Sequence, residues 1–396
     1  MTPALLFAKK YFKQFEGVPF EVVISTGESF IVGEGRPKFR VIFKKPVSIA
    51  GLIKSSTLTL GEAYMDGILE IEGNLFKVLN YLFKFTGIFN SDEGLLKKLL
   101  FTSTDAANQK CEVCSHYDLG NDFYSLWLGN TMNYSCAYFE KDSETLDEAQ
   151  RDKNLYILKK LNLKPGMKLL DIGCGWGSLI ADAAEKCGAD CTGITLSEEQ
   201  YKWCNDFFAK KGLSEKARVR LMDYRELAES GLTFDRIVSV GMLEHVGRDN
   251  YPLFMDNINS VLKEKGLTLL HYISALGEYP GNAWLKKYIF PGGVIPSLRE
   301  IVNMAGDRNF YILDIESLRR HYIKTLLCWY DSFDKQKSRI MPMFSEKFVR
   351  MWKLYLCGCA ASFSNGVVDL HQILFSKGVS DEIPMTRDYL YQSWSM

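Results

Sequence analysis

The chain lacks several features that define large classes of proteins. It has no run of about 18 uncharged apolar residues, which a membrane-spanning helix needs, and no N-terminal basic-then-apolar secretion signal. Its 48 Lys and Arg residues equal its 48 Asp and Glu residues, so no net positive charge attracts nucleic acid. We therefore expect a cytoplasmic protein with no nucleic-acid partner.

Two common nucleotide-binding motifs are missing around a glycine-rich turn. Gly173, Gly175 and Gly177 follow a short apolar run, but their spacing is not the G-x-G-x-x-G of dinucleotide-binding proteins. Thr195 stands where such proteins carry an acidic ribose ligand, and no Gly-Lys-Ser/Thr of a P-loop follows the glycines. The strand, turn and helix pattern of residues 168–184 still predicts a ligand site, because glycine permits close approach and a helix start offers free N–H groups.

The cysteine pattern does not predict a metal site. The ten cysteines of a cytoplasmic protein are expected to be reduced thiols. Cys111-x-x-Cys114 has the spacing of half a zinc knuckle, but no second pair stands at a matching distance. We therefore predict that the protein binds no metal.

Residues 1–105 are predicted to form a small N-terminal α+β domain. Alternating stretches predict strands at 21–24, 29–32 and 40–43, and apolar residues at helical spacing predict helices at 73–89 and 94–101. Both helices are edged with lysine. This pattern fits docking on a membrane surface or pairing into a homodimer, and it fits equally well helices that cover the domain's own sheet. The polar residues 101–110 are the predicted linker.

Residues 106–396 are predicted to form a larger second domain. Strands alternate with helices in a βαβ rhythm, which predicts a doubly wound, mostly parallel α/β sheet of Rossmann type with its ligand at the carboxyl ends of the strands. A helix at 144–160 leads into the glycine turn, and residues 275–313 interrupt the rhythm as an insertion or lid. The strands are expected at 168–171, 190–195, 218–222, 236–240, 267–273, 311–315 and 370–375.

Six motifs, in order along the chain, resemble those of the cyclopropane fatty acid synthases. They are YSCAYF at 134–139, LLDIGCGWGS at 169–178, GITLSEEQ at 193–200, SVGMLEHVG at 239–247, YIFPGG at 288–293 and CAASF at 359–363. The resemblance spans roughly residues 110–380. The residues before it are similar to the extra domain of the branch that modifies bacterial phospholipids, which the shorter branch acting on mycolic acids lacks.

The resemblance implies an enzyme that uses S-adenosylmethionine (SAM) to add a methylene carbon across the cis double bond of unsaturated phospholipid acyl chains. Such an enzyme would be cytoplasmic and peripheral at the inner membrane surface. The resemblance also assigns residues to SAM. They are Tyr134 and Ser135 at the methionine end, Gly173, Gly175 and Gly177 for close approach, Thr195 and Gln200 in the second-strand motif, and Asp223 and Tyr224 near the adenine.

The implied reaction places physical demands on its site. The sulfonium makes the methyl group of SAM an electrophile, and attack by an isolated alkene leaves a carbocation that needs shielding from water and a base to remove one methyl proton. In the resembled family the base is a bound bicarbonate ion. Its positions match Cys136, Glu244, His271, Ile273 and Tyr322 here. Glu244 is expected to orient the ion, while His271 and Tyr322 donate hydrogen bonds to it. Cys136 and Ile273 are expected to contribute backbone groups.

Cys359 matches a cysteine of the family's C-terminal signature, which makes it a candidate active-site thiol. Methyl transfer to an alkene needs no covalent enzyme intermediate. A cysteine in an apolar stretch such as CGCAASF is usually an inert small hydrophobe. We therefore favour packing near the acyl chain over a nucleophilic role for this residue.

Two other functions stay open from the sequence. The first is a simple SAM-dependent methyltransferase that makes methyl-branched lipids or methylates a small amine, because the glycine turn fits any such enzyme. The second is a noncatalytic lipid-binding protein that kept the fold and lost the chemistry. The presence of every glycine and polar position expected for SAM disfavours this second function.

Overall fold

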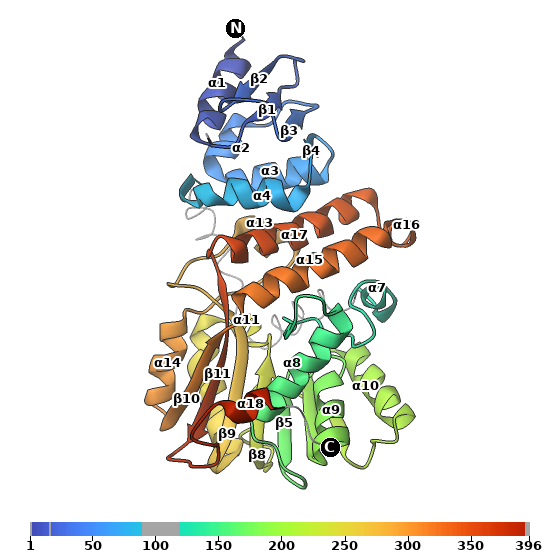
Figure 1. The fold of residues 1–396 in the computed structure, drawn as a ribbon, viewed down its shortest axis with the longest axis vertical. Helices are drawn as coiled ribbons and strands as arrows, with labels where there is room; N and C mark the ends of the chain where they lie inside the picture. The colour runs from blue at the N-terminus through green and yellow to red at the C-terminus, as the bar shows by residue number, and fades with distance from the viewer. Residues whose placement is uncertain (1, 16, 89–118, 393–396) are drawn as a thin grey trace. The chain divides into compact units, whose positions relative to one another are not determined.

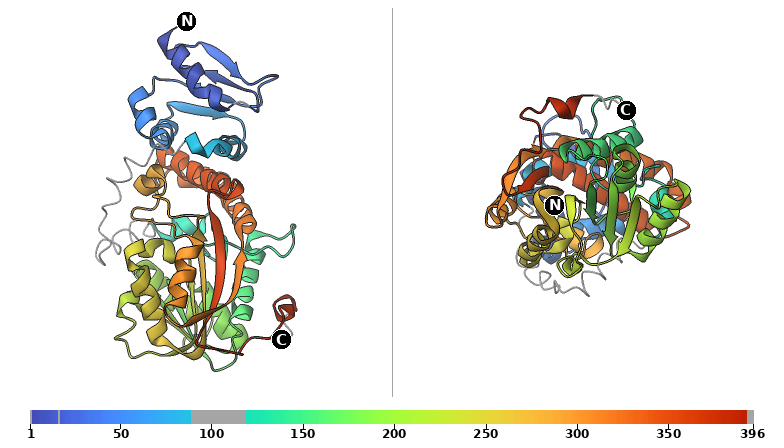
Figure 2. Two further views of the ribbon diagram at one scale, coloured as in Figure 1. Left: turned by 90° about the vertical axis from the view of Figure 1, so that its left-hand side faces the viewer. Right: turned by 90° about the horizontal axis from the view of Figure 1, so that it is seen from below.

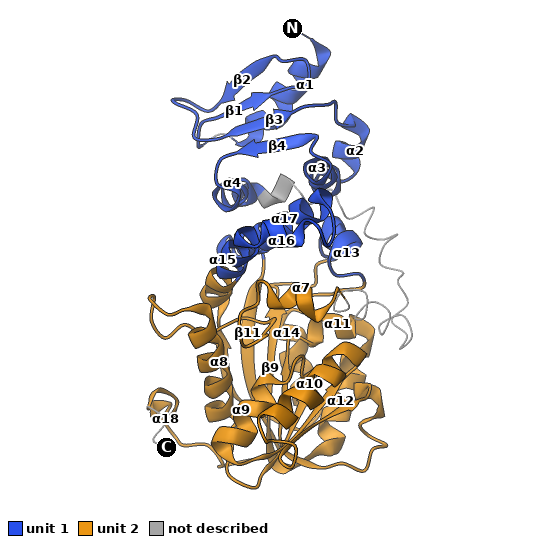
Figure 3. Cartoon of the chain, turned by 90° about the vertical axis from the view of Figure 1, so that its right-hand side faces the viewer, with its two compact units in different colours: residues 1–102, 280–291, 326–367 blue, residues 103–279, 292–325, 368–396 orange. Residues whose placement is uncertain are grey.

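The computed structural model describes residues 2–15, 17–88 and 119–392, and the chain forms two compact units. Unit 1 combines residues 1–102, 280–291 and 326–367, and unit 2 combines residues 103–279, 292–325 and 368–396 (Figure 3). Each unit is therefore discontinuous in sequence. The predicted single boundary near residue 105 does not describe this division, because later parts of the chain complete unit 1.

Unit 1 contains a small mixed sheet with helices packed around it (Figure 1). Within the described residues this sheet has four strands in the order β2-β1-β3-β4, and only the β1–β3 pair is parallel. The strands are β1 (Phe20–Val23), β2 (Ser29–Val32), β3 (Arg40–Phe43) and β4 (Leu69–Glu72). The helices are α1 (Pro3–Phe12), η1 (Lys13–Phe15), α2 (Ile49–Lys54), α3 (Ser56–Met65), α4 (Leu75–Leu82), η2 (Phe83–Ile88), α13 (Ala283–Tyr288), α16 (Lys337–Ile340) and α17 (Glu346–Ser364).

The core of unit 1 joins the N-terminal strands to helix α17. Phe20 of β1 belongs to the same buried cluster as Cys357 and Ala361 of α17. Arg350 of α17 also binds the carboxylate of Glu70 on β4, with nitrogen to oxygen distances of 3.2 Å. Because apolar packing and an ion pair both link α17 to the sheet, this late helix is part of the small unit's structure.

Helix α4 uses its apolar face inside unit 1. Leu75, Val78, Leu79 and Tyr81 are buried in the core of this unit. This agrees with the interpretation in which the helix covers its own domain, and it leaves α4 without an apolar face for a membrane. The second predicted lysine-edged helix at 94–101, the linker and the Cys-x-x-Cys motif lie outside the described residues.

The predicted lid is divided between the two units. Residues 280–291 belong to unit 1, where Trp284 is buried and Lys287 forms an ion pair with Glu62 at 2.6 Å. Residues 292–313 belong to unit 2. The charge of Lys287 is therefore neutralised by a carboxylate of its own unit.

Unit 2 consists of a large sheet with helices on both faces (Figure 1). Its strands are β5 (Lys168–Ile172), β6 (Asp190–Thr195), β7 (Ala217–Leu221), β8 (Phe234–Val240), β9 (Leu262–Ser274), β10 (Phe310–Ser317) and β11 (Asp369–Lys377). Its helices are α7 (Asn121–Ser125), α8 (Leu146–Lys160), α9 (Ser178–Cys187), α10 (Glu198–Lys210), η4 (Tyr224–Glu226), α11 (Leu243–Val246), η5 (Arg248–Asn250), α12 (Tyr251–Val261), α14 (Leu298–Gly306) and α18 (Asp388–Tyr391). Helix α15 (Arg319–Lys335) begins in unit 2 and ends in unit 1.

The strand order of unit 2 places a ligand crevice at β5. The order is β10-β11-β9-β8-β5-β6-β7, and β11 is the strand that runs antiparallel to both neighbours. The chain moves outward from β5 to β7 and then returns to β8 on the other side of β5. A reversal of this kind opens a crevice at the carboxyl ends of the strands. The predicted doubly wound, mostly parallel α/β fold is confirmed.

Helices cover both faces of this sheet (Figure 2), and each face carries its own apolar core. Leu169 packs in the core that includes helices α8, α9 and α10, whereas Leu170 packs in the core that includes α12 and α14. Strand residues two apart share a face. Asp171 therefore lies on the α8 face with Leu169, and His271 lies on that same face with Leu269.

Helix α8 begins at a capping box, which fixes the helix start ahead of the glycine turn. The Oγ1 of Thr145 accepts a hydrogen bond from the N–H of Glu148 at 3.3 Å, and the Glu148 carboxylate accepts one from the N–H of Thr145 at 2.8 Å. This agrees with the helix predicted at 144–160. Among the described helices, none combines the length and the apolar character that crossing a bilayer requires.

Candidate functional site

The turn between β5 and α9 carries the three predicted glycines. Gly173, Gly175 and Gly177 have φ angles of 81°, 55° and 82°, which residues with side chains rarely adopt. The N–H groups of Gly173 and Cys174 both donate to the carbonyl oxygen of Ile194, at 3.0 and 3.1 Å. The turn is therefore anchored to the neighbouring strand β6 in a conformation that requires glycine.

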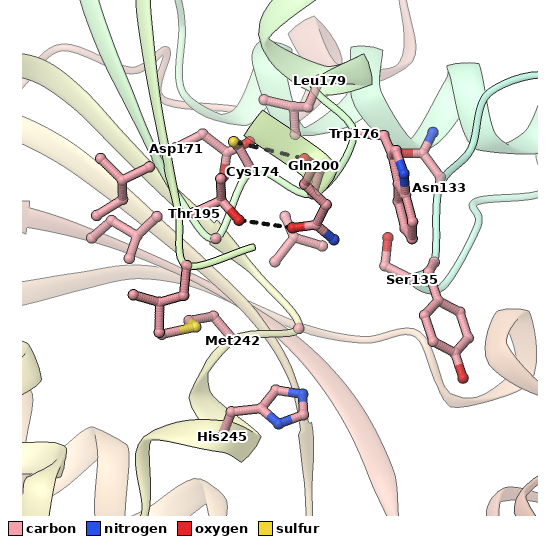
Figure 4. Close-up of a pocket in the computed structure, with 18 of the residues that line it drawn as sticks. Asn133, Ser135, Asp171, Cys174, Trp176, Leu179, Thr195, Gln200, Met242 and His245 are labelled. Atoms are coloured by element: carbon pink, nitrogen blue, oxygen red, sulfur yellow. Dashed lines mark hydrogen bonds between the residues drawn. The ribbon is translucent and has the colours of Figure 1, made fainter. Parts of the chain in front are cut away.

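A cavity opens beside this turn at the carboxyl edge of the sheet (Figure 4). Its walls come from the glycine turn, the ends of β6 and β8, the start of α11 and the segment before α8. Most of the residues predicted to bind SAM lie in its lining. They are Tyr134, Ser135, Gly173, Gly175, Thr195, Gln200 and Tyr224.

Two of the residues predicted for SAM do not line the cavity. A Cβ atom on Gly177 would lie 2.7 Å from the ring of Phe208, so this glycine permits helix packing. Asp223 caps the short helix η4 and forms an ion pair with Arg225 at 2.8 Å. Tyr224, the neighbour of Asp223, does line the cavity. The structure therefore brings the third-strand motif to the site through Tyr224.

A hydrogen-bonded pair at the end of β6 presents a fixed polar surface to the cavity. The Oγ1 of Thr195 donates to the Oε1 of Gln200 at 2.8 Å (Figure 4). The same hydroxyl oxygen accepts the N–H of Ser197 at 3.2 Å, and all three side chains are buried. The amide of Gln200 is thereby held in one orientation at the cavity wall.

The charges in the cavity suit a zwitterionic ligand. Lys153 and Asp171 both line the cavity, and both side chains are buried. The Oδ1 of Asp171 has no hydrogen-bond partner within the described parts of the chain. A Cβ atom on Gly175 would meet nothing within 4 Å, so the turn leaves open space. SAM carries an ammonium, a carboxylate and a bulky nucleoside, and these residues fit all three.

Burial sets the protonation of the titratable groups around the cavity. It raises the pKa of Asp171 to about 7 and lowers the pKa of Lys153 to about 8. It also lowers the pKa of His245, another lining residue, to about 4. His245 is therefore a neutral imidazole at physiological pH.

Glu244 precedes His245 on the short helix α11 and reaches the end of β9. Its Oε1 accepts the N–H of Ile273 at 2.6 Å. Its Oε2 is buried and has no hydrogen-bond partner among the residues that the structure describes. Burial raises the pKa of this carboxyl group to about 7. Glu244 therefore has one oxygen engaged and one available.

His271 lies on β9, two residues before Ile273 and on the same face of the sheet. Its Nδ1 is 3.1 Å from the side-chain amide nitrogen of Gln372 on β11, and its Nε2 is buried without a partner in the described chain. Burial, together with the positive charges of Lys153 and Lys160, holds the pKa of His271 well below its usual value. The ring is therefore neutral. With the Gln372 amide nitrogen facing Nδ1, the matching tautomer of the neutral ring carries its proton on Nε2.

Cys136 and Tyr322 meet at the carbonyl oxygen of Leu318. The sulfur of Cys136 lies 3.9 Å from this oxygen and 3.2 Å from the carbonyl oxygen of Ala137, and the N–H of Tyr322 donates to the Leu318 oxygen at 3.1 Å. The N–H of Leu318 in turn donates to Leu370, which pairs with Ile273 of β9. Together with the bond from Ile273 to Glu244, these contacts link the segments that carry Cys136, Tyr322 and Glu244 to the end of β9.

Comparison with known proteins identifies the family. Residues 104–373 match the family described as mycolic acid cyclopropane synthetase. The chain belongs to this family. A cyclopropane-fatty-acyl-phospholipid synthase of Escherichia coli K12 is 37% identical and aligns over 87% of this chain and 89% of its own length. A probable fatty acid methyltransferase of Pseudomonas putida is 36% identical and aligns over 95% of this chain and 97% of its own length.

A solved structure of this cyclopropane synthase family shares the fold. The mycolic acid cyclopropane synthase CmaA1, crystallised with S-adenosylhomocysteine (SAH) and CTAB, has a TM-score of 0.64 and 35% identity, and the match covers 68% of this chain and 98% of that one. The chain is therefore a SAM-dependent transferase, as its sequence predicted. Residues 7–93 match a domain of unknown function.

Cys359, the signature cysteine of the family's C-terminal motif, lies in α17 of unit 1. The other predicted catalytic residues all lie in unit 2. Burial raises the pKa of the Cys359 thiol to about 12. A thiol with this pKa stays protonated at neutral pH and is a poor nucleophile, which favours the packing role.

Sequence reasoning did not select Lys153 and Gln372 as site residues. Lys153 stands four residues from both Ala149 and Ile157, which are buried. Helical spacing alone therefore places Lys153 on the apolar face of α8, and this could have marked it as a buried lysine. No sequence pattern marked Gln372 as a site residue. Its partner His271 lies 101 residues earlier in the chain, and only the pairing of β9 with β11 brings them together.

Proposed function

We propose that this enzyme transfers a methylene carbon from SAM to the cis double bond of unsaturated acyl chains in phospholipids, closing a cyclopropane ring, with bound bicarbonate as the base. The similarity to the Escherichia coli phospholipid synthase over 87% of this chain supports the substrate. The N-terminal match at residues 7–93 lies outside the 104–373 region of the mycolic acid family, which also favours a phospholipid.

One observation carries the bicarbonate assignment. The Oε2 of Glu244 and the Nε2 of His271 are both buried and lack partners within the described residues. Buried polar atoms in proteins are nearly always hydrogen-bonded, so two unpartnered atoms near the same end of β9 support a small polar ligand there. The neutral ring of His271 donates through Nε2. Glu244, with a pKa raised to about 7, exchanges protons readily at neutral pH. A bicarbonate ion offers oxygens to accept from His271 and a hydroxyl to bind Glu244.

The chain's own residues create the dry surroundings that this reaction needs. Bound SAM supplies an electrophilic methyl group. Attack by the alkene leaves positive charge on the acyl chain, which water would trap. The buried side chains of His271 and Cys136 keep bulk water from this end of the sheet. A base held inside this region removes a methyl proton, and the ring then closes.

Ile273 contributes its backbone in a different way from the one predicted. Its N–H donates to the Oε1 of Glu244, so this N–H serves the carboxylate and not the anion. Ile273 is thus a positioning residue for Glu244.

We assign Tyr322 as a donor to the anion, and its position at the start of α15, where its N–H and the Cys136 sulfur approach the same carbonyl oxygen, supports this assignment. Burial raises the pKa of the Cys136 thiol, so Cys136 stays neutral.

A phospholipid substrate requires the enzyme to work peripherally at a bilayer surface, and we place it at the cytoplasmic side of the inner membrane. Helix α2 of unit 1 supports this part of the proposal. Ile49 and Ile53 on this helix are 45% and 70% exposed, and Lys45 and Lys54 are exposed beside them. Apolar side chains enter the headgroup region, and lysines bind anionic lipids.

Product analysis tests the proposed reaction. The enzyme, incubated with SAM and vesicles of a phospholipid with cis-monounsaturated chains, is expected to yield chains that gain one CH2 and lose their olefinic protons, as measured by mass spectrometry and proton NMR. Removing dissolved carbonate is expected to slow turnover, and added bicarbonate, but not chloride, is expected to restore it. Unchanged acyl chains would contradict the substrate. Turnover without any response to bicarbonate would contradict the base alone.

A second function is favoured by one comparison. The Pseudomonas putida relative, similar over 95% of this chain, is named a probable fatty acid methyltransferase. A methyltransferase would add the same mass but leave a double bond, because a saturated methyl branch requires a reductant that the reaction mixture lacks. Retained olefinic protons in a product heavier by CH2 would therefore favour the methyltransferase over the cyclopropane synthase.

A further inference from the structure

Lys153 is a buried ammonium without a carboxylate beside it. Its side chain is 1% exposed, and its Nζ donates to the Oγ of Ser135 at 3.2 Å. Within the described chain, no Asp or Glu oxygen lies within 4.0 Å of this Nζ. Burying an ammonium is strongly unfavourable unless an anion compensates it. The cavity that Lys153 lines is therefore the place to look for this anion.

The carboxylate that comes nearest to this role does not fill it. Asp171 lines the same cavity and interacts electrostatically with Lys153, but the two do not form an ion pair. The Oδ1 of Asp171 is itself buried and has no hydrogen-bond partner among the described residues. The cavity thus holds one positive and one negative group, each with capacity for a charged partner.

The methionine end of SAM carries a carboxylate and an ammonium. Ser135, the hydrogen-bond partner of Lys153, lines the cavity at the position that the family resemblance assigns to this end of SAM. We propose that Lys153, with Ser135 beside it, is the counter-ion that binds the methionine carboxylate of SAM. The proposal rests on the assignment of the cofactor and is independent of the lipid substrate and of bicarbonate.

Calorimetric binding of three ligands to the full-length protein tests this role. SAH has the carboxylate, its decarboxylated analogue keeps only the amine, and 5′-methylthioadenosine lacks both. The Lys153→Met variant keeps the apolar stem of the side chain and removes its charge. It is expected to bind SAH about 10- to 100-fold more weakly, while the affinities for the other two ligands stay within about twofold of wild type. Lys153→Arg is expected to recover part of the loss.

Lys159→Met is the matched control on the same helix. The Nζ of Lys159 donates to the carbonyl oxygens of Leu390 and Gln392, so this variant is expected to leave all three affinities unchanged. If Lys153→Met weakens the binding of all three ligands equally, the proposal is overturned, because only a general defect of the cavity would lower all three affinities alike. Should Lys153→Met not fold, the wild-type protein still decides. Equal wild-type affinities for SAH and its decarboxylated analogue would overturn the proposal, and failure to bind any of the ligands would overturn the cofactor assignment with it.

Discussion

At the scale of single residues, the tautomer of His271 depends on Gln372. The Gln372 side chain is 1% exposed and lies 3.1 Å from the Nδ1 of His271. This contact favours the tautomer with the ring proton on Nε2, the atom that would donate to the proposed bicarbonate. A neutral His271 without this partner would populate both tautomers. One of them presents a lone pair, which repels an anion.

Replacing Gln372 with Leu is expected to raise the bicarbonate concentration for half-maximal turnover about 10-fold and to leave the KM for SAM unchanged. Turnover measured against bicarbonate at saturating SAM checks this. Thr268→Val is the matched control, since Thr268 is equally buried on the strand of His271 but on the opposite face. An unaltered bicarbonate response in the Gln372→Leu variant would exclude the positioning role.

Replacing Glu244 with Gln is expected to abolish turnover and to stabilise the fold at alkaline pH. Burial raises the pKa of Glu244 from 4.5 to about 7. The folded state therefore binds this proton more tightly than the unfolded state does, and its free energy of unfolding falls as the pH rises from 4.5 to 7. Gln carries no charge to bury. The variant should exceed wild type by about 3 kcal/mol at pH 8 and by less than about 1 kcal/mol near pH 5.

Urea unfolding of both proteins at the two pH values measures this difference. SAH binding by calorimetry provides the control, because Glu244 does not line the SAM cavity and its loss should leave this affinity within about threefold. A stability difference of the same size at both pH values would show that the carboxyl group titrates normally. Full activity of the variant would remove Glu244 from the mechanism.

The chemistry of these residues could be anticipated, but their individual partners could not. The resemblance named Glu244 and His271, and the structure shows that both carry a bare buried atom. The sequence could not show that the N–H of Ile273 is occupied by Glu244, because this bond joins residues 29 positions apart across a strand end. Hydrogen-bond partners depend on the register of the sheet, which composition and spacing do not determine.

At the scale of elements, the glycines of the β5–α9 turn have different structural roles. The sequence treats Gly175 and Gly177 alike, as members of one motif. In the structure a Cβ atom on Gly175 would enter open space, whereas one on Gly177 would collide with Phe208 and Cys204. Both glycines have a positive φ, so both substitutions strain the backbone.

Two alanine variants separate these tasks. Gly177→Ala is expected to lower the free energy of unfolding by about 2 kcal/mol, because backbone strain and overpacking against Phe208 add together. Gly175→Ala is expected to cost about 1 kcal/mol from strain alone, but to weaken SAH binding at least about 10-fold, because its methyl group enters the cavity. Thermal unfolding and calorimetry measure both quantities. A larger stability loss for Gly175→Ala than for Gly177→Ala would contradict the assignment.

The strands were more predictable than the helices of unit 1. The expected strands at 29–32, 40–43 and 190–195 coincide with β2, β3 and β6, because alternation or a short apolar run marks them locally. Helix α3 was not predicted. Its sequence contains Gly61 and β-branched residues, which weaken helices, and Gly61 is there because a side chain would collide with the remote Trp284. Tertiary packing therefore overrides local propensity in this helix.

At the scale of the whole molecule, the fold and the family could be predicted, but the discontinuity of the units could not. The sequence pattern does change near residue 105, from short alternating stretches to a βαβ rhythm. Helix α17 nevertheless completes the core of unit 1. Arg350 and Glu70 are 280 residues apart and form an ion pair. A chain that started near residue 105 would expose Cys357 and Ala361, which unit 1 buries. Membrane docking must therefore be tested on the full chain.

Ile53→Glu in the full chain is expected to reduce binding to phospholipid vesicles at least about fivefold, because an exposed apolar side chain is lost and a charge that anionic headgroups repel is added. Ile31→Glu is the matched control. Ile31 is 54% exposed on β2, compared with 70% for Ile53 on α2, so both variants should unfold at the same temperature. Co-sedimentation with anionic and with neutral vesicles measures binding. Because Lys45 precedes α2 and Lys54 ends it, wild-type binding should also weaken on neutral vesicles. Equal losses of vesicle binding in both variants would place the docking surface elsewhere on the chain.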